Sequence, residues 1–342
     1  MLFRSICRAI QRADLKVYDL TLQPLASAAF SAQLVRAQMN ERRFFADLAA
    51  EIGTMMDCCD FARTAWGPAF DLVALDGANL EKLADAAPAA GLEALAGLAR
   101  HRVIRGYAPR EVPDALLRLV CAAALSSPTK SDLQQRDLVL VTDAPTRARL
   151  AGLCGGDHWM PSAPAWIVAC GNHRRQRQLH EWRGHPFAND HLDAFFNASV
   201  DAAIALTWAV AAAEAAGLGC CPVSQIRNHP AEVAALLGLP GHVFAVAGLT
   251  IGWPANEGML SPRLPLAATL HSDRFDDGDA RAHVDAYDRR RHALQPYRRQ
   301  RDTARFGEAA LYGWSEEKAR HYAEEQRAGF GAHVRAIGFS LD

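Results

Sequence analysis

The long apolar segment at 191–216 most strongly limits what this chain can fold into. It follows a helical pattern and is closed by Gly217 and Gly219 in the manner of a helix C-cap. Asp201 and Glu214 interrupt it and alanine dominates it, which disfavours a transmembrane span. The pattern therefore predicts a buried core helix and no membrane partner. We interpret the two carboxylates as solvated or paired groups rather than as general acids or bases.

Short β-rich runs lie on both sides of this helix. The segments 137–141, 165–170 and 243–253 are apolar, rich in β-branched residues, and bounded by polar residues or proline. They predict buried central strands. The second and third runs are separated by the long helix, so they do not form a hairpin.

Two further helices have recognisable ends. Pro113 begins a helix with a leucine face, which we expect to run to about Ser126. Another helix is predicted over 314–328, with Ser315 as its N-cap and Gly329 as its stop.

Length and charge restrict the class of protein. The 342 residues favour two domains, or one large domain with an appendage. Lys and Arg number 37 against 38 Asp and Glu, so the net charge of −1 gives no overall field for a polyanion, and we expect no nucleic-acid partner. Residues 1–90 indicate a helical extension whose role the sequence does not reveal, ahead of a domain at 91–342.

The cysteines and the N-terminus indicate a cytoplasmic protein. Eight cysteines are too few for a disulfide scaffold in a chain of this length. Two adjacent pairs lack C-x-x-C spacing, which favours buried structural thiols over redox-active ones. The N-terminus has no apolar core of the kind found in secretory signals. Four histidines between 173 and 191 have no cysteine or paired carboxylate at ligand spacing, so we expect no metal site.

Three local groups are suited to a polar or anionic ligand. In HRVIR, at 101–105, two arginines stand beside a histidine, and the paired donors of a guanidinium match phosphate oxygens. A basic surface turn is the alternative interpretation. The loop at 126–134 is rich in hydroxyl groups, and Arg263 lies between two prolines on a stiff backbone.

From about residue 100 to its end, the chain resembles the FMN-dependent nitroreductases, specifically the oxygen-insensitive NADPH nitroreductase and flavin reductase P subgroup. HRVIR is similar to the family's opening H/R-R-S-I/V-R phosphate motif, and SPTKSDLQ stands where its serine-rich flavin loop lies. The stretch GLGCCPVSQIRNHPAEVAALLGLPGHVFAVAGLTIGWPA is similar almost throughout to the family's segment ending in G-W-P-A, and SPRLP is similar to K-P-R-L-P. The resemblance implies an α+β fold with a central, mainly antiparallel sheet flanked by helices.

The resemblance also implies a set of FMN-binding residues drawn from five segments. They are His101, Arg102, Val103, Arg105, Thr129, Ser131, Gln134, Asp157, His158, Pro222, Val223, Ser224, Gln225, Ser261 and Arg263. The histidine and the arginines would hold the phosphate and the polar edge of the ring system. The backbone at 222–225 would cover one face of the flavin and donate N–H groups toward its N5 edge.

Three departures from the family pattern concern this site. Val103 stands in place of a serine and Ser261 in place of a lysine, which removes a hydroxyl donor and a positive charge. Ser224 and Gln225 stand in place of two glycines and add side chains close to the flavin. We expect FMN binding to survive these changes and substrate choice to depend on them.

The resemblance implies an obligate homodimer. Two FMN molecules would lie at its interface, together with the 191–216 helix, and the C-terminal arm would wrap around the partner. NADPH or NADH would deliver hydride to the flavin, and a small-molecule acceptor such as a nitroaromatic, a quinone or free flavin would take the electrons in a ping-pong cycle. No side chain is expected to act as a catalytic group, because the flavin carries the chemistry.

A basic stretch near the C-terminus has two interpretations. In the related enzymes such a segment accommodates the 2′-phosphate of NADPH, which would assign that role to Arg298, Arg299, Arg301 and Arg305. A solvated linker is the alternative. Two other functions also stay open: a different flavin chemistry on the same scaffold, such as reductive dehalogenation or flavin destruction, and a non-catalytic flavin-binding or regulatory protein.

Overall fold

The computed structural model describes residues 94–95, 97–156 and 159–342. These residues belong to two compact units. The first, the core unit, comprises Arg102–Met259 and Ala319–Asp342. The second, the arm unit, comprises the described residues up to His101 and Leu260–Lys318. The expected helical extension at 1–90 lies outside the described residues.

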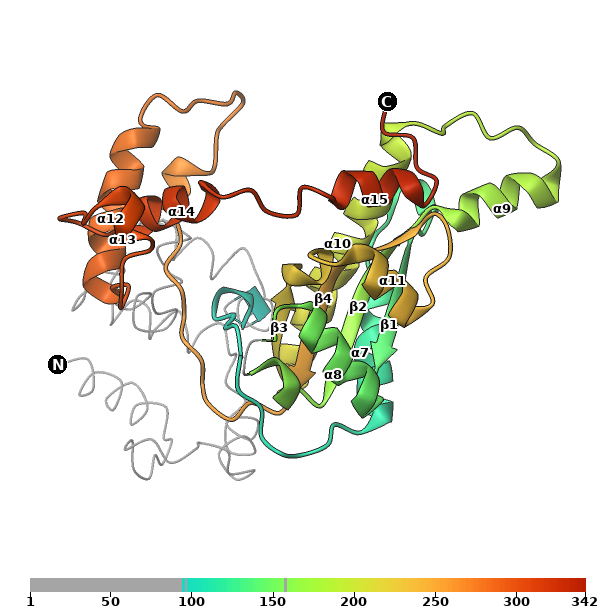
Figure 1. Ribbon diagram of the computed structural model, residues 1–342, viewed down its shortest axis with the longest axis horizontal. Helices are drawn as coiled ribbons and strands as arrows, with labels where there is room; N and C mark the ends of the chain where they lie inside the picture. The colour runs from blue at the N-terminus through green and yellow to red at the C-terminus, as the bar shows by residue number, and fades with distance from the viewer. Residues whose placement is uncertain (1–93, 96, 157–158) are drawn as a thin grey trace, which may run out of the picture. The chain divides into compact units, whose positions relative to one another are not determined.

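A four-stranded sheet forms the centre of the core unit (Figure 1). Its strands are β1 (Arg136–Val141), β2 (Ala165–Asn172), β3 (Gly219–Val223) and β4 (Val243–Gly252). The order across the sheet is β1-β2-β4-β3, and every neighbouring pair is antiparallel. This confirms the expected α+β fold with an antiparallel sheet.

Two sequence expectations about the strands were wrong in detail. The run at 137–141 forms β1, which is an edge strand with half-buried residues and not a central one. β3 was not predicted, because its sequence GCCPV lacks alternation and contains a proline, which is tolerated on an edge strand. Gly219 opens β3 and does not cap the preceding helix. Gly217, whose φ is +74°, performs that role alone.

Helices cover both faces of the sheet (Figure 1). α7 (Asp114–Leu125) and α10 (Leu192–Ala215) pack together on one face. α8 (Ala144–Leu153) and α11 (Pro230–Leu237) cover the other. Side chains along β2 alternate between the two faces of the sheet. Trp166 lies in the core cluster under α8 and α11, whereas Ala165 and Ile167 lie in the cluster under α7 and α10.

α10 packs on the sheet through a stripe of small residues. By length and composition this helix could cross a membrane, yet its inner face is closely packed in the core unit. Asp201 lies within that stripe and is fully buried, so of the two expected alternatives, a solvated or a paired carboxylate, the solvated one does not hold. The buried residues of α10 are Ala194, Ala198, Asp201, Ala202, Ala205, Ala209 and Ala213.

The end of the chain packs on its own core unit. α15 (Phe330–Ala336) and the residues after it bring Phe339 against Phe244, with ring centroids 5.3 Å apart. His242 contacts the carbonyl oxygen of Gly338 through Nε2 at 2.9 Å. Residues 319–342 therefore belong to the core unit, and the wrapping of a partner subunit by the C-terminal arm stays a prediction.

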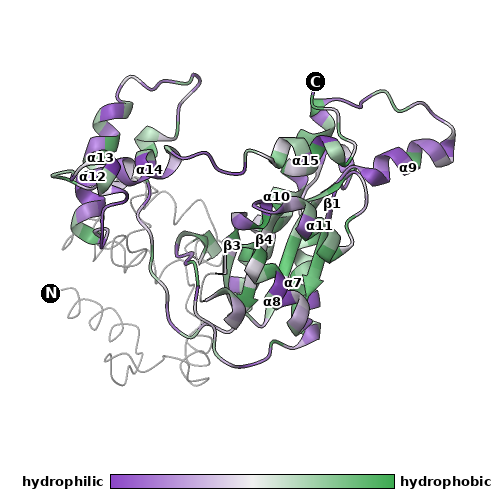
Figure 2. Cartoon of the chain, viewed as in Figure 1, coloured by the Kyte–Doolittle hydropathy of each residue, from purple (hydrophilic) through white to green (hydrophobic). Residues whose placement is uncertain are grey.

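α9 (Arg174–Arg183) connects β2 to the loop before α10. Figure 2 shows this helix as mostly hydrophilic, in contrast to the apolar strands of the sheet. Arg175 joins it to β1 through an ion pair with Asp137 at 2.6 Å. Within the described residues, four short 3₁₀ turns complete the connections: η2 (Lys130–Asp132), η3 (Met160–Ser162), η4 (Ser224–Arg227) and η5 (Leu266–Ala268).

Between η5 and α15 the chain forms α12 (Ala280–Leu294), α13 (Thr303–Phe306) and α14 (Trp314–Tyr322). α14 is shorter than the helix predicted over 314–328. Ser315 does not cap it through its own side chain; instead, Asp288 accepts the Ser315 backbone N–H at 2.9 Å and also its hydroxyl. Gly329 is the N-cap of α15 rather than the stop of α14.

Candidate functional site

The 102–105 segment is held between β3 and the chain that follows β4. Val103 forms isolated β-bridges with Cys220 on one side and Met259 on the other. The backbone N–H of Ile104 donates to the carbonyl oxygen of Cys220 at 2.9 Å. The two arginines of this segment are therefore carried on a backbone that is fixed on both sides.

The two arginine side chains differ in their surroundings. Arg105 is exposed, and its guanidinium carbon lies 5.9 Å from the ring centroid of Trp159. Arg102 is half-buried and donates through Nη1 to the carbonyl oxygen of Glu257 at 3.4 Å. Its Nε is buried and has no hydrogen-bond partner among the described residues. A buried donor without a partner is costly, so this group is suited to an anionic ligand.

Arg105 also contacts a cysteine that the sequence analysis did not select. Burial raises the pKa of the Cys221 thiol, and the charge and hydrogen bond of Arg105 partly offset that rise. Cys221 belongs to β3 and is buried, so its thiol is a packing neighbour of Arg105 and is not exposed to solvent. Trp159 was also missed, and the only signal was an aromatic residue directly after the predicted contacts at 157 and 158. Asp157 and His158 themselves lie outside the described residues.

The predicted ring-covering residues lie where β3 passes into η4. Pro222 and Ser224 are exposed, Val223 is buried, and Gln225 is half-buried. The Nε2 atom of Gln225 would lie 3.8 Å from a Cβ placed on Gly155. The end of β3 therefore faces the loop that leads to Trp159. The structure places Arg105 beside Trp159, and Gly155 beside Gln225 at the start of η4.

The hydroxyl-rich loop lies at a different corner of the sheet. The loop with Thr129, Ser131 and Gln134 leads into Arg136, the first residue of β1. Arg136 pairs with Gly171 of β2, and Gly171 pairs with Phe244 near the start of β4. Cys220, by contrast, pairs with Ile251 at the other end of β4 and on the opposite edge strand. Strand spacings put the starts of β1 and β3 roughly 25 Å apart. Within one core unit, this loop is therefore too far from Arg102 and Arg105 to share a ligand phosphate with them.

The remaining predicted FMN contacts belong to the arm unit. His101 is half-buried, and Ser261 and Arg263 are exposed. Arg263 donates through Nη1 to the carbonyl oxygen of Ser261 at 3.1 Å. The buried hydroxyl of Tyr287 donates to the carbonyl oxygen of Pro262 at 2.8 Å, which holds the Pro-Arg-Leu-Pro stretch against α12. The approach of these residues to the 102–105 segment stays a prediction.

The four arginines proposed for NADPH differ in their availability. Arg301 forms an ion pair with Glu317 at 2.9 Å. Burial would raise the pKa of Glu317, but hydrogen bonds from Tyr312 and Arg301 outweigh it and the pKa is lowered. Arg305 lies over the Phe306 ring at 4.8 Å. The other two, Arg298 and Arg299, are exposed.

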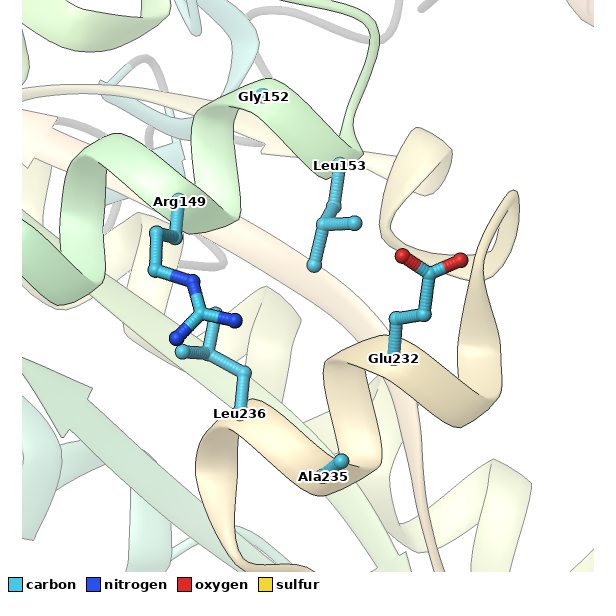
Figure 3. A pocket seen from close by; sticks show the side chains of 6 residues that line it. All are labelled: Arg149, Gly152, Leu153, Glu232, Ala235 and Leu236. Carbon is cyan, nitrogen blue, oxygen red and sulfur yellow. The ribbon is translucent and has the colours of Figure 1, made fainter.

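A hollow of about 470 Å³ lies between α8 and α11 (Figure 3). Figure 3 shows Arg149 extending from α8 and Glu232 from α11 around Leu153 and Leu236. It contains none of the predicted site residues. One cation beside one carboxylate does not favour a phosphate dianion, so this hollow is not a candidate for the flavin phosphate.

Comparison with known proteins identifies the family to which the chain belongs. The model of the Nitroreductase family matches residues 98–253, and the model of the family's C-terminal domain matches residues 261–342. The FMN reductase [NAD(P)H] of Bacillus subtilis is 31% identical over 235 residues, which cover 67% of this chain and 91% of the relative. The chain belongs to the nitroreductase family.

Other relatives agree with this assignment. The oxygen-insensitive NADPH nitroreductase of Salmonella typhimurium is 34% identical over 183 residues, covering 53% of this chain and 74% of the relative. The solved structure of Bacillus megaterium NfrA2 superposes on the nitroreductase fold described above with a TM-score of 0.67, at 29% identity and over 73% of this chain and 99% of that one. This nitroreductase-family chain is an FMN-dependent NAD(P)H oxidoreductase. The buried, unpartnered Nε of Arg102 and the exposed guanidinium of Arg105 fit the phosphate of that cofactor.

Proposed function

We propose that this nitroreductase-family enzyme uses NAD(P)H to reduce electron-poor small molecules such as nitroaromatics, quinones or free flavin in a ping-pong cycle. The chemistry that FMN supplies when bound is hydride transfer between the nicotinamide and the acceptor. The carrying observation is the fixed 102–105 segment, which presents an unpartnered Arg102 donor and an exposed Arg105 guanidinium beside the end of β3.

In this proposal the side chains bind and orient, and none acts as a nucleophile or a general base. Arg102 and Arg105 hold the phosphate through charge-assisted hydrogen bonds. The backbone of 222–225 covers the ring and offers N–H groups at the edge where charge gathers on reduction. Gln225, which takes the place of a family glycine, narrows the space beside Gly155 and restricts the acceptors.

We further propose that the enzyme is a homodimer in the cytoplasm. The separation of the 129–134 loop from Arg102 and Arg105 supports this, because a second copy could bring its own loop to the first copy's arginines. The outer face of α10 also carries exposed apolar side chains, among them Phe196 and Trp208. Monomeric proteins rarely expose a continuous apolar stripe of this kind. The five cysteines of the described residues are free thiols, in keeping with a reducing compartment.

The identity of the bound chromophore tests the proposed function. Protein purified without added cofactor should be yellow with a flavin spectrum, and it should oxidise NADPH when a quinone is present. Initial rates with both substrates varied should give parallel double-reciprocal lines, as in a ping-pong cycle. Colourless protein that does not respond to added FMN would refute the assignment.

A further inference from the structure

Asp201 is an unusual residue for its position on α10. It lies in the inner stripe of the helix among alanines, and its side chain is fully buried. Burial of a carboxylate is unfavourable unless its oxygens receive hydrogen bonds. No basic side chain forms an ion pair with it among the described residues. Lys130 contacts Asp201 through its backbone only, and its Nζ lies 3.9 Å from Oδ2 of Asp193.

The Asp201 carboxylate is satisfied by the backbone of one loop. Oδ1 accepts the N–H of Lys130 at 3.0 Å, and Oδ2 accepts the N–H of Gln135 at 2.9 Å. These two donors stand at the two ends of the η2 loop. A single side chain on α10 therefore fixes both ends of the segment that contains Ser131 and Gln134 and follows Thr129.

The backbone of this loop has several unfavourable conformations. Ser131, Asp132 and Gln134 all have φ between 50° and 56°, in the left-handed region that non-glycine residues rarely occupy. Such conformations persist only where surrounding contacts over-determine them. α9 adds support, since Arg175 donates to the carbonyl oxygen of Gln134 at 2.6 Å. The buried Gln176 of α9 donates through Nε2 to the carbonyl oxygen of Leu133 at 2.6 Å, so Asp201 is one of two buried side chains that hold this loop.

We propose that Asp201 is a positioning residue that holds the η2 loop in the shape in which Thr129, Ser131 and Gln134 contact FMN. This inference rests on the proposed function, because the loop's flavin contacts are part of it. Asp201 itself touches no cofactor. Its two carboxylate oxygens set the spacing of the loop ends, between which Ser131, Asp132 and Gln134 adopt left-handed backbone conformations.

The first test compares two substitutions on the same helix. Asp201→Asn keeps the side-chain shape but has only one acceptor oxygen, so one of the two N–H donors loses its partner. Amide hydrogen exchange at Lys130 and Gln135 should accelerate by about tenfold, and the FMN dissociation constant should rise by about tenfold. Asp193→Asn, which removes an exposed carboxylate near Lys130 Nζ, should change neither quantity. Unchanged exchange and FMN affinity in Asp201→Asn would overturn the proposal.

The second test removes a donor instead of the acceptor, so that it does not depend on the folding of a core variant. Lys130→Pro deletes the N–H that Oδ1 accepts, at the first position of a short helical turn where proline is compatible with the backbone. It should weaken FMN binding and speed exchange at Gln135, whereas Lys130→Ala, which keeps the N–H, should do neither. Equal behaviour of these two variants would contradict the proposal even if Asp201→Asn cannot be purified.

The readouts separate this inference from the proposed function. If wild-type protein binds FMN and both Asp201→Asn and Lys130→Pro bind it equally well, the function stands and the positioning role is refuted. If wild-type protein binds no FMN, the proposed function is refuted and the positioning role toward FMN falls with it. Exchange rates at Gln135 would then still show whether Asp201 holds the loop.

Discussion

The guanidinium of Arg105 lies 5.9 Å from the ring centroid of Trp159, and the same side chain contacts the buried thiol of Cys221. Each partner comes from a different part of the core unit, one from the loop after α8 and the other from β3. Arg105 therefore has a neighbour on two sides, and no carboxylate among the described residues forms an ion pair with it. A confined, unneutralised cation is a good phosphate ligand, because little conformational entropy remains to be lost on binding.

Arg102→Ala and Arg105→Ala should each weaken FMN binding by about ten- to a hundredfold, since each removes charge-assisted hydrogen bonds to the phosphate. Fluorescence titration of apoprotein with FMN measures the effect. Arg110→Ala is the matched control, because Arg110 is on the same stretch of chain but stacks over Trp253 at 4.1 Å. Full flavin occupancy in both site variants would show that the phosphate binds elsewhere.

Arg298→Ala and Arg299→Ala should raise KM for NADPH more than KM for NADH. The exposed guanidiniums are available for the 2′-phosphate, a group that NADH lacks. Steady-state kinetics with both nucleotides measures the split. Arg301→Ala should instead lower thermal stability through loss of its ion pair with Glu317. Equal changes of KM for the two nucleotides in Arg298→Ala would move the role to another segment.

The stability of the protein should fall on acidification through His173. Burial lowers the pKa of His173 to about 4, below the ordinary value of 6.5. The unfolded chain therefore binds a proton at a higher pH than the folded protein does. This stability is fully present above pH 6.5 and is lost as the pH falls from 6.5 toward 4, by on the order of 3 kcal/mol.

His173→Gln should make the free energy of unfolding less dependent on pH across that window. Urea unfolding at pH 7.5 and pH 5 measures the difference between the variant and the wild type. His229→Gln is the control, because His229 is exposed and pairs only with Glu232 on the surface. An unchanged pH dependence in His173→Gln would mean that other groups account for the acid sensitivity.

Gly219→Ala should destabilise the junction between β3 and the 102–105 segment. A Cβ at Gly219 would lie 2.7 Å from Cγ1 of Ile104, which is too close without movement of one backbone. The cost should be about 1–3 kcal/mol, with accompanying loss of FMN affinity. Gly152→Ala, where nothing lies within 4 Å of the added carbon, should be tolerated.

Phe196→Glu and Trp208→Glu should convert the proposed dimer into monomers and weaken FMN binding together. These side chains are 60% and 44% exposed on the outer face of α10, where a second copy would cover them. Sedimentation velocity reports the mass and FMN fluorescence the affinity. Trp182→Glu on α9 is the control, since that side chain is 67% exposed on a different helix. Retention of the dimer in both α10 variants would place the interface elsewhere.

Local sequence patterns predicted several of the regular elements correctly. The helix after Pro113, the long helix α10 and the strands β2 and β4 each carry a strong signal within one segment. β3 carries no such signal, because GCCPV becomes a strand only through its pairing with β4 and Val103. The end of α14 was also missed, because no residue in the sequence marks Tyr322 as the last of the helix. Its start depends on a distant residue, since Asp288 accepts the backbone N–H of Ser315.

The amino-acid sequence by itself determined the family, the positions of the motif arginines and the elements with a clear period, because these depend on residues close together in the chain. Only the tertiary structure showed that Arg105 lies beside Trp159 and Cys221, that the 129–134 loop is at another corner of the sheet, and that Asp201 holds both ends of that loop. The reason is that each of these relationships joins residues brought together by strand pairing and helix packing, and no local pattern records which distant backbone a side chain will meet.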